Sequence, residues 1–233
     1  YSHEYANVHR GLHYLSNLAT EKYESTRGVI AKFLGVKDED EIVMNTGTTM
    51  GINTVAYGWG MPNLQAGDEI ILSDPHYACY PNFIRFARGV PVAVPVYEEE
   101  GFQYTTAGIK EKISDRTKGV FINSPSNPTG NVMSEQRMKN IADLCSEKGI
   151  PLISDEIYHG LVYEGKEHSI LEFTDNAFVF NGFSKLFAMT GLRLGYIIAP
   201  KPHIRTLQVL HQNFFICANS VTQSCGARAL LES

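Results

Sequence analysis

Short apolar segments rich in valine and isoleucine recur along the chain, and most show no alternation between apolar and polar positions. Strands that are buried on both faces of a mostly parallel sheet have this pattern. The segments are 41–45, 68–73, 91–96, 118–123, 151–155, 177–181 and 195–200. The pattern therefore predicts a mostly parallel sheet of about seven strands.

Helical periodicity lies between several of these strands. One helix is predicted after Ser134, a candidate N-cap, and it should end at Gly149. A second should run from about Leu18 to Leu34, with Gly35 at its end. The apolar positions are Met138, Ile141, Ala142 and Cys145 in the first helix, and Val29, Ile30 and Phe33 in the second. Alternating strands and helices predict an α/β fold with helices on both faces of the sheet.

The composition indicates a sizeable hydrophobic core and gives no sign of a surface that binds nucleic acid or other polyanions. The chain has 233 residues, 43% of them hydrophobic, and a formal net charge of -5. This length suits one large domain, 1–233, or at most two small ones. Because no block of five like charges occurs, we do not expect nucleic acid or an anionic membrane as the main partner.

The sequence carries no targeting or metal-binding signal. No apolar run approaches the roughly 20 residues that cross a bilayer, and the start does not resemble a leader. The four cysteines show no C-x-x-C pair and no metal-ligand spacing, so no metal site is predicted. Cys79 and Cys145 lie among apolar residues and are expected to be reduced core thiols. We expect a cytoplasmic protein.

Candidate chemistry lies in the loops after the strands, because ligands of open α/β sheets bind at the carboxyl ends. The loop TGTTMG places Gly47, Thr48 and Thr49 at a helix start. A glycine lets the backbone approach a ligand, and donors at a helix N-terminus suit a phosphate. Taken alone, these residues are explained better by a capped helix start without any ligand.

Two further loops present an aromatic and an amide. In DPHYACYPN, the Tyr77 ring could lie against a flat ligand or simply pack within the loop. His76 beside it could be a base or a metal ligand, or an ordinary exposed histidine. In SPSNPTG, prolines fix a rigid turn that presents Asn127, and an Asx-turn without function is the alternative.

The last two loops carry the charged candidates. Asp155 in SDEIYHG ends a strand predicted to be buried, where a carboxylate is costly unless it is paired. Tyr158 lies three residues further on. After the next strand come Ser184 and Lys185, a lysine that a desolvated pocket can turn into a nucleophile. Arg193 is a permanent charge suited to phosphate, although a lone lysine and arginine are usually surface residues.

One cofactor accounts for all of these loops together. Pyridoxal phosphate needs a lysine for its aldehyde, an acid beside its ring nitrogen, and donors to its phenolic oxygen. It also needs an aromatic ring over its own ring and a cup for its phosphate. The residues after the strands supply each of these groups.

Three motifs resemble a known family. SPSNPTG, SDEIY and GFSKLFAMTGLRLGY are similar to motifs of the class I/II aminotransferases, which are fold-type I pyridoxal-phosphate enzymes. The resemblance covers roughly residues 66–233 and implies a three-layer αβα large domain of the aspartate-aminotransferase type. It also implies a homodimer and a small C-terminal domain with a substrate-binding arginine. No such domain follows Ser233, so we expect a truncated chain.

The resemblance further implies a role for each site residue. Lys185 would form the internal aldimine and then move the substrate proton, and Asp155 would keep the ring nitrogen protonated. The other implied contacts are Asn127 and Tyr158 to the phenolic oxygen, Tyr77 to the ring, and Gly47, Thr48, Ser184 and Arg193 to the phosphate. Many family members have a serine where this chain has Gly182, so one phosphate donor is expected to be missing or replaced.

Residues 1 to about 60 resemble a different branch, the class V cysteine desulfurases. Their GTT turn also holds the phosphate, which adds Thr49 to the expected phosphate site. The two resemblances meet between about Trp59 and Asp74, and a recombined, engineered or reconstructed sequence is one hypothesis for this seam.

Three functions follow from the sequence. The leading one is an aminotransferase that exchanges an amino group between an amino acid and a 2-oxo acid. The first alternative is a cysteine desulfurase or other C–S lyase, although desulfurases typically carry a histidine where this chain has Ser184. The second alternative is a cofactor-binding or structural module without turnover.

Overall fold

A seven-stranded sheet organises the computed structural model, which describes residues 14–233. Its spatial order is β1-β7-β6-β5-β4-β2-β3, and β7 alone runs antiparallel to its neighbours. The strands are β1 (Ile42–Asn45), β2 (Glu69–Asp74), β3 (Val90–Pro95), β4 (Thr117–Asn123), β5 (Leu152–Asp155), β6 (Ala177–Gly182) and β7 (Gly195–Ile198). The predicted mostly parallel sheet is therefore confirmed. Residues 1–13, where the class V resemblance begins, lie outside the described residues.

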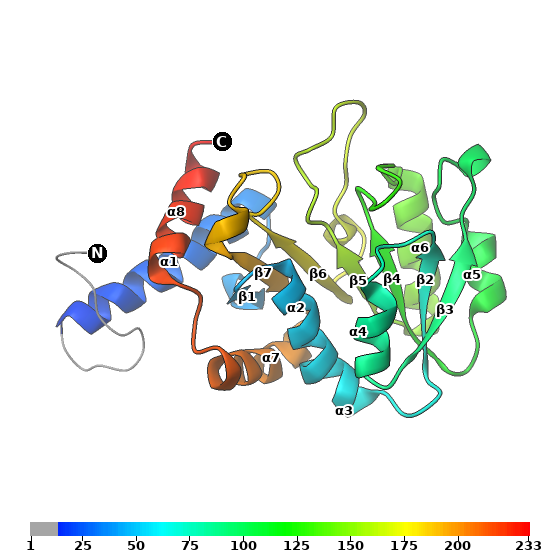
Figure 1. The fold of residues 1–233 in the computed structure, drawn as a ribbon, viewed down its shortest axis with the longest axis horizontal. Coiled ribbons are helices and arrows are strands. Elements are labelled where there is room, and N and C mark those ends of the chain that lie inside the picture. The colour runs from blue at the N-terminus through cyan, green and yellow to red at the C-terminus, as the bar shows by residue number, and fades with distance from the viewer. Residues whose placement is uncertain (1–13) are drawn as a thin grey trace.

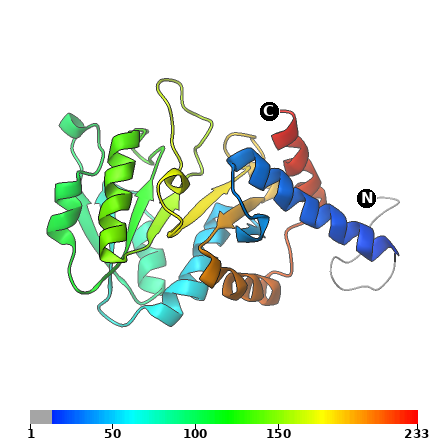
Figure 2. The ribbon, with the colours of Figure 1, turned by 180° about the vertical axis from the view of Figure 1, so that it is seen from behind.

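Helices cover both faces of this sheet (Figures 1 and 2). One face carries α2 (Thr48–Val55), the π-helix η2 (Ala56–Gly60), α3 (Met61–Asn63), α4 (Tyr80–Phe86) and α7 (Lys201–Phe214). The other carries α1 (Tyr14–Leu34), α5 (Thr106–Lys112), α6 (Glu135–Lys148) and α8 (Ser220–Leu231). Short 3₁₀ turns are η1 (Glu39–Glu41), η3 (Glu98–Glu100), η4 (Ile170–Glu172) and η5 (Thr190–Leu192). The arrangement is the expected three-layer αβα fold.

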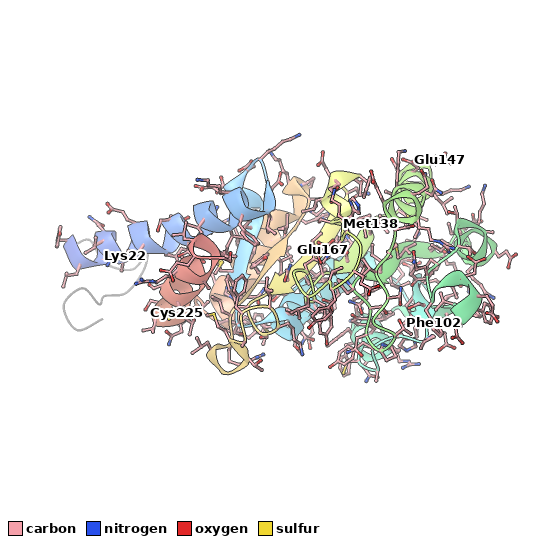
Figure 3. The ribbon with its side chains drawn as sticks, turned by 90° about the horizontal axis from the view of Figure 1, so that it is seen from above. Lys22, Phe102, Met138, Glu147, Glu167 and Cys225 are labelled. Atoms are coloured by element: carbon pink, nitrogen blue, oxygen red, sulfur yellow. The ribbon has the colours of Figure 1, made fainter. Side chains whose placement is uncertain are left out.

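The two helices predicted from sequence are present. Ser134 caps α6 by accepting from the backbone N–H of Arg137, and Gly149 ends it in a left-handed conformation with φ 65°. All four predicted core positions of α6 are buried, and Figure 3 shows one of them, Met138, on this helix. Helix α1 begins at Tyr14, somewhat earlier than predicted.

Three expectations about burial were wrong. Strand β3 is mostly exposed, because it is the edge strand and pairs only with β2. Phe33 of α1 is 47% exposed, although Ile30 of the same predicted set is fully buried together with Ala31. Cys79 is only half-buried at the start of α4, whereas Cys145 is buried as expected. Burial raises the pKa of the Cys145 thiol to about 12.

Helices α1 and α8 pack side by side at one end of the molecule, where Figure 3 labels Lys22 and Cys225. No helix among residues 14–233 combines the length and the apolar character that crossing a membrane requires. The same residues contain no cluster of histidine, cysteine, aspartate or glutamate suited to a metal ion.

The ring of Phe178 in β6 tests the packing of the central sheet. It is fully buried and lies 5.2 Å from the Trp59 ring, centroid to centroid. Replacing it with alanine should lower the free energy of unfolding by about 3–5 kcal/mol, because the substitution leaves a cavity. Urea denaturation measures this loss. Phe86→Ala is the control, since Phe86 is 64% exposed and should cost no more than about 0.5 kcal/mol. Equal losses would contradict the packing described.

Candidate active site

A pocket of about 230 Å³ lies at the carboxyl ends of the central strands. Its lining comes from loops that are far apart in the sequence but follow neighbouring strands. The lining residues are Thr48, Thr49, Ile52, Tyr77, Tyr80, Phe83, Asn127, Asp155, Ile157, Tyr158, Ser184, Lys185, Thr190 and Arg193. The structure thus brings together all the site residues predicted from sequence except Gly47, which lies directly beside Arg193.

The carboxylate of Asp155 lies at the end of β5 and is only 5% exposed. Its Oδ2 accepts a hydrogen bond from the Tyr80 hydroxyl at 2.9 Å, and its Oδ1 accepts from the Ile157 N–H at 3.2 Å. Burial raises the pKa of Asp155 to about 6, although both hydrogen bonds oppose this shift. The site therefore holds a carboxyl group whose pKa is shifted toward neutral pH.

Tyr80 is a residue that the sequence reasoning missed. It begins α4, is 3% exposed, and its ring lies 5.4 Å from that of Tyr77 in an edge-on arrangement. The hydrogen bond to Asp155 and burial raise the pKa of Tyr80 well above its ordinary value, with burial the larger cause. The only sequence signal was its place three residues after Tyr77 on the same loop.

Lys185 and Tyr158 face each other across the pocket. The Nζ of Lys185 lies 5.2 Å from the centre of the Tyr158 ring, within the range of a cation–π contact. The Tyr158 hydroxyl in turn accepts a long hydrogen bond of 3.4 Å from Asn127 Nδ2. Lysine, phenol and amide therefore form one connected group beside Asp155.

Asn123, at the end of β4, is a second residue that the sequence reasoning missed. Its Oδ1 accepts from the Asn127 N–H at 2.7 Å, and its Nδ2 donates to the Asp155 carbonyl oxygen at 2.8 Å. One side chain therefore fixes the loop that carries Asn127 relative to β5. Asn123 was not singled out because it belongs to the strand and not to the loop.

The turn after β1 forms a concave surface beside Arg193. Gly47 has φ 110°, and a Cβ there would lie 2.8 Å from Arg193 Nη2, so only glycine fits. Asn45 shapes this turn by accepting from the Gly47 N–H at 2.8 Å. Within residues 14–233, the buried Oγ1 of Thr48 has no hydrogen-bond partner. An unpaired hydroxyl, a helix start and a guanidinium together suit an oxyanion.

The arginine itself is held by the loop before β7. Arg193 Nη1 donates to the Thr190 carbonyl oxygen at 3.0 Å, and the Thr190 hydroxyl donates to the Ser184 carbonyl oxygen at 2.7 Å. This chain of contacts connects Arg193 to the residue directly before Lys185. The cation and the lysine are therefore presented from one loop.

Gly182 has no room for a side chain. A Cβ at this position would lie 2.9 Å from the Leu194 carbonyl oxygen and 3.3 Å from Thr48 Oγ1. A serine there would require the backbone between β6 and β7 to shift. The Thr48 hydroxyl lies next to the place where that serine's side chain would begin.

Comparison with known proteins agrees with this arrangement. The model of the family "Aminotransferase class I and II" matches residues 16–233. The chain belongs to this family. The match also includes most of the stretch whose motifs resemble the class V branch. Class I and II aminotransferases use pyridoxal phosphate.

Relatives and solved structures of the family share the fold. The chain is 42% identical over 176 residues to a probable aspartate/prephenate aminotransferase of Aquifex aeolicus, and 36% identical over 208 residues to an aspartate aminotransferase of Sulfurisphaera tokodaii. The Thermus thermophilus aspartate aminotransferase solved with maleate superposes with a TM-score of 0.84 at 31% identity, over 90% of this chain. The predicted aspartate-aminotransferase type of large domain is therefore confirmed.

The chain spans about half the length of the curated relatives that it matches. It covers 44% of the Aquifex aeolicus aminotransferase, 51% of the Sulfurisphaera tokodaii enzyme and 55% of the Thermus thermophilus chain. The matched alignments account for 73%, 87% and 90% of this chain, respectively.

The raised pKa of Asp155 predicts a specific pH dependence of stability. The pKa of Asp155 is about 6 in the folded chain and near 3.8 when unfolded. Between pH 3.8 and 6, the folded state therefore keeps a proton on Asp155 that the unfolded state has largely lost. The contribution of Asp155 to the free energy of unfolding should therefore fall as pH rises from 4 to 6, by about 2 kcal/mol. Asp155→Asn should lack this decline in urea titrations.

The control for this titration is Asp115→Asn, because Asp115 is exposed. That variant should keep the pH dependence of the unmodified chain. A difference curve between Asp155→Asn and the unmodified chain that stays flat from pH 4 to 6 would contradict the assigned shift.

Proposed function

We propose that this chain binds pyridoxal phosphate and carries the cofactor chemistry of an aminotransferase that moves an amino group between an amino acid and a 2-oxo acid. The observation that carries the proposal is the shared pocket. It places a lysine amine, a buried carboxyl group and an oxyanion-binding turn together. These are the groups that the cofactor requires.

The turn after β1 fits the cofactor's phosphate. In the proposed complex, the phosphate accepts from the Thr48 hydroxyl, whose hydrogen-bonding capacity is unused among residues 14–233. Arg193 supplies the balancing positive charge, while Gly47 leaves the space beside its guanidinium open. Thr49 and Ser184 line the same part of the pocket. Thr48 would thus replace the donor that Gly182 cannot provide.

The opposite side of the pocket fits the cofactor's ring. Asp155 would face the ring nitrogen and stabilise its proton, since a carboxylate beside a cationic ring favours the charged pair. The carboxyl group is also held in place by Tyr80. Asn127 and Tyr158 would bond the phenolic oxygen, and Tyr77 would cover the ring face. When bound, the cofactor supplies an aldehyde that reacts with amines and a ring that accepts electrons.

Lys185 would move the proton in this reaction. The amine is free of ion pairs among the described residues, and its cation–π contact with Tyr158 holds it on the Asp155 side of the pocket. A neutral lysine within reach of the substrate α-carbon can take a proton and return it.

The wider context is also proposed on the basis of the family. The substrates would be an amino acid and a 2-oxo acid, the assembly a homodimer, and the location the cytoplasm. Residues 1–233 would form the cofactor-binding large domain, with a class V-like first part to about residue 60. The printed names of the relatives differ in their substrates, so no particular amino acid is assigned.

A spectral titration tests the function. The purified chain, loaded with pyridoxal phosphate, should show a visible absorption band that an amino acid converts to the pyridoxamine spectrum and a 2-oxo acid restores. Candidate donors such as aspartate and aromatic amino acids should be compared. Release of sulfide from cysteine would support the desulfurase instead. A loaded chain whose spectrum no amino acid alters would support the non-catalytic module.

Lys185→Ala tests the choice of lysine. The unmodified chain should keep the cofactor covalently after borohydride reduction, because reduction fixes a lysine–cofactor bond. Lys185→Ala should lose this link completely, as mass spectrometry of the intact chain would show. Lys166→Ala is the matched control, since Lys166 is exposed on the loop between β5 and β6. A reducible link that survives in Lys185→Ala would place the bond on another lysine.

A further inference from the structure

A second buried carboxylate lies directly behind the site. Glu156 follows Asp155 but points to the opposite face of the sheet, because successive residues of an extended chain alternate. It is 2% exposed, and its N–H donates to the Phe180 carbonyl oxygen at 2.9 Å, which continues the ladder between β5 and β6. No step of the proposed reaction uses this residue.

The Glu156 carboxylate collects donors from separate segments of the chain. Its Oε1 accepts from the Ser154 hydroxyl at 2.9 Å and from the Ile170 N–H at 3.0 Å. Its Oε2 lies 3.5 Å from Nδ1 of His159. Ser169 also donates to the carboxylate, and Tyr196 of β7, two strands away in the sheet, lies near enough for the Glu156 charge to raise its pKa, after the larger effect of burial.

These contacts enclose the turn that carries Asp155 and Tyr158. Ser154 lies before the turn, His159 lies within it, and Ile170 belongs to η4 at the far end of the long loop that rises above β5 in Figure 1. The His159 N–H also donates to the Glu156 carbonyl oxygen at 3.0 Å. One carboxylate therefore joins the strand, the turn and the returning loop.

The end of the turn is also fitted to the lysine loop. Gly160 has φ 84°, and a Cβ there would lie 2.4 Å from a methyl group of Leu186. Leu186 directly follows Lys185. A displacement of the turn would therefore move the surroundings of the lysine as well as Asp155 and Tyr158.

The cost of this arrangement indicates that the carboxylate does more than fill space. Burial raises the pKa of Glu156, against the opposing effects of His159, Ile170, Ser169 and Ser154. A buried charge of this kind is often less stabilising than an apolar side chain of similar size. What the carboxylate does provide is a fixed geometry, because its Oε1 accepts from two separate segments and its Oε2 lies beside His159.

We propose that Glu156 is a positioning residue of the cofactor site, which holds the turn so that Asp155 and Tyr158 face the cofactor's ring. The inference rests on the proposed function. The Glu156 charge would also add to the effect of burial in raising the pKa of Asp155, in the direction opposite to His159.

Two substitutions separate geometry from charge. Glu156→Gln keeps an oxygen for Ser154 and Ile170 and removes the charge. Glu156→Leu removes every acceptor at similar volume. The matched control is Glu69→Leu, because Glu69 is also buried, accepts from the Ser114 hydroxyl at 2.6 Å and pairs with Arg116 at 2.7 Å. Glu69 lies at the amino end of β2, whereas the site lies at the carboxyl ends of the strands.

Cofactor affinity and amide exchange are the measurements. Glu156→Leu should weaken pyridoxal phosphate binding about tenfold or more, since small displacements of site groups are costly. In the chain without cofactor, it should also speed hydrogen exchange at the Ile157 amide, which is bonded to Asp155. Glu69→Leu should leave both within about twofold while losing a similar amount of stability.

Glu156→Gln adds a spectroscopic test. Its affinity should stay within about threefold, because the hydrogen bonds to Ser154 and Ile170 remain. The pH midpoint of the bound cofactor's absorption change should fall by about half a unit, because a nearby negative charge that favours the protonated form is gone. Should Glu156→Leu fail to fold, Ser154→Ala replaces it, with weaker binding and faster Ile157 exchange again expected.

The outcomes distinguish the two proposals. If the unmodified chain takes up no pyridoxal phosphate, the proposed function is wrong and this inference falls with it. If the unmodified chain binds the cofactor but Glu156→Leu and Glu69→Leu bind it equally well, only the role of Glu156 is overturned. An unchanged pH midpoint in Glu156→Gln would contradict the proposed effect of the Glu156 charge, and the positioning role would then rest on geometry alone.

Discussion

The site depends on a carboxylate that the fold removes from water. Asp155 gives up its hydration at the end of β5, and this desolvation is offset by the Tyr80 hydroxyl and the Ile157 N–H. The Tyr80 bond joins residues 75 positions apart, so it forms only when α4 starts at the correct place above the sheet. The position of the helix and the protonation of the carboxyl group are thereby coupled.

The topology of the sheet explains how one pocket collects so many loops. Parallel strands end at a common edge, so the residues after β1, β2, β4, β5 and β6 meet there. The antiparallel strand β7 begins at that same edge. Arg193 therefore precedes its strand instead of following one, yet it lies beside Ser184 and Lys185. The reversal of a single strand keeps the whole loop between β6 and β7 at the site.

Local patterns predicted the elements better than they predicted the contacts between them. Runs of valine and isoleucine identified the strands, and the capping residues Ser134 and Gly149 identified α6. The roles of Tyr80, Asn123 and Glu156 escaped notice because each acts on a partner or segment that tertiary structure brings close. The lack of space at Gly182 is similar, since it depends on the Leu194 carbonyl oxygen of the neighbouring strand connection.

The relatives differ in the substrates that their names state, but they belong to a family with one cofactor. Proteins named for aspartate or prephenate, for a furan phosphate and for aromatic substrates all match this chain over similar stretches. What the family shares is the cofactor pyridoxal phosphate, and the pocket described here is lined by groups of the kinds that this cofactor requires. Two adjacent carboxyl groups would have different tasks in the proposed site. Asp155 lines the pocket, and the buried Glu156 would hold the turn in place. In the proposed function, this fixed geometry at the lysine would be compatible with different substrates.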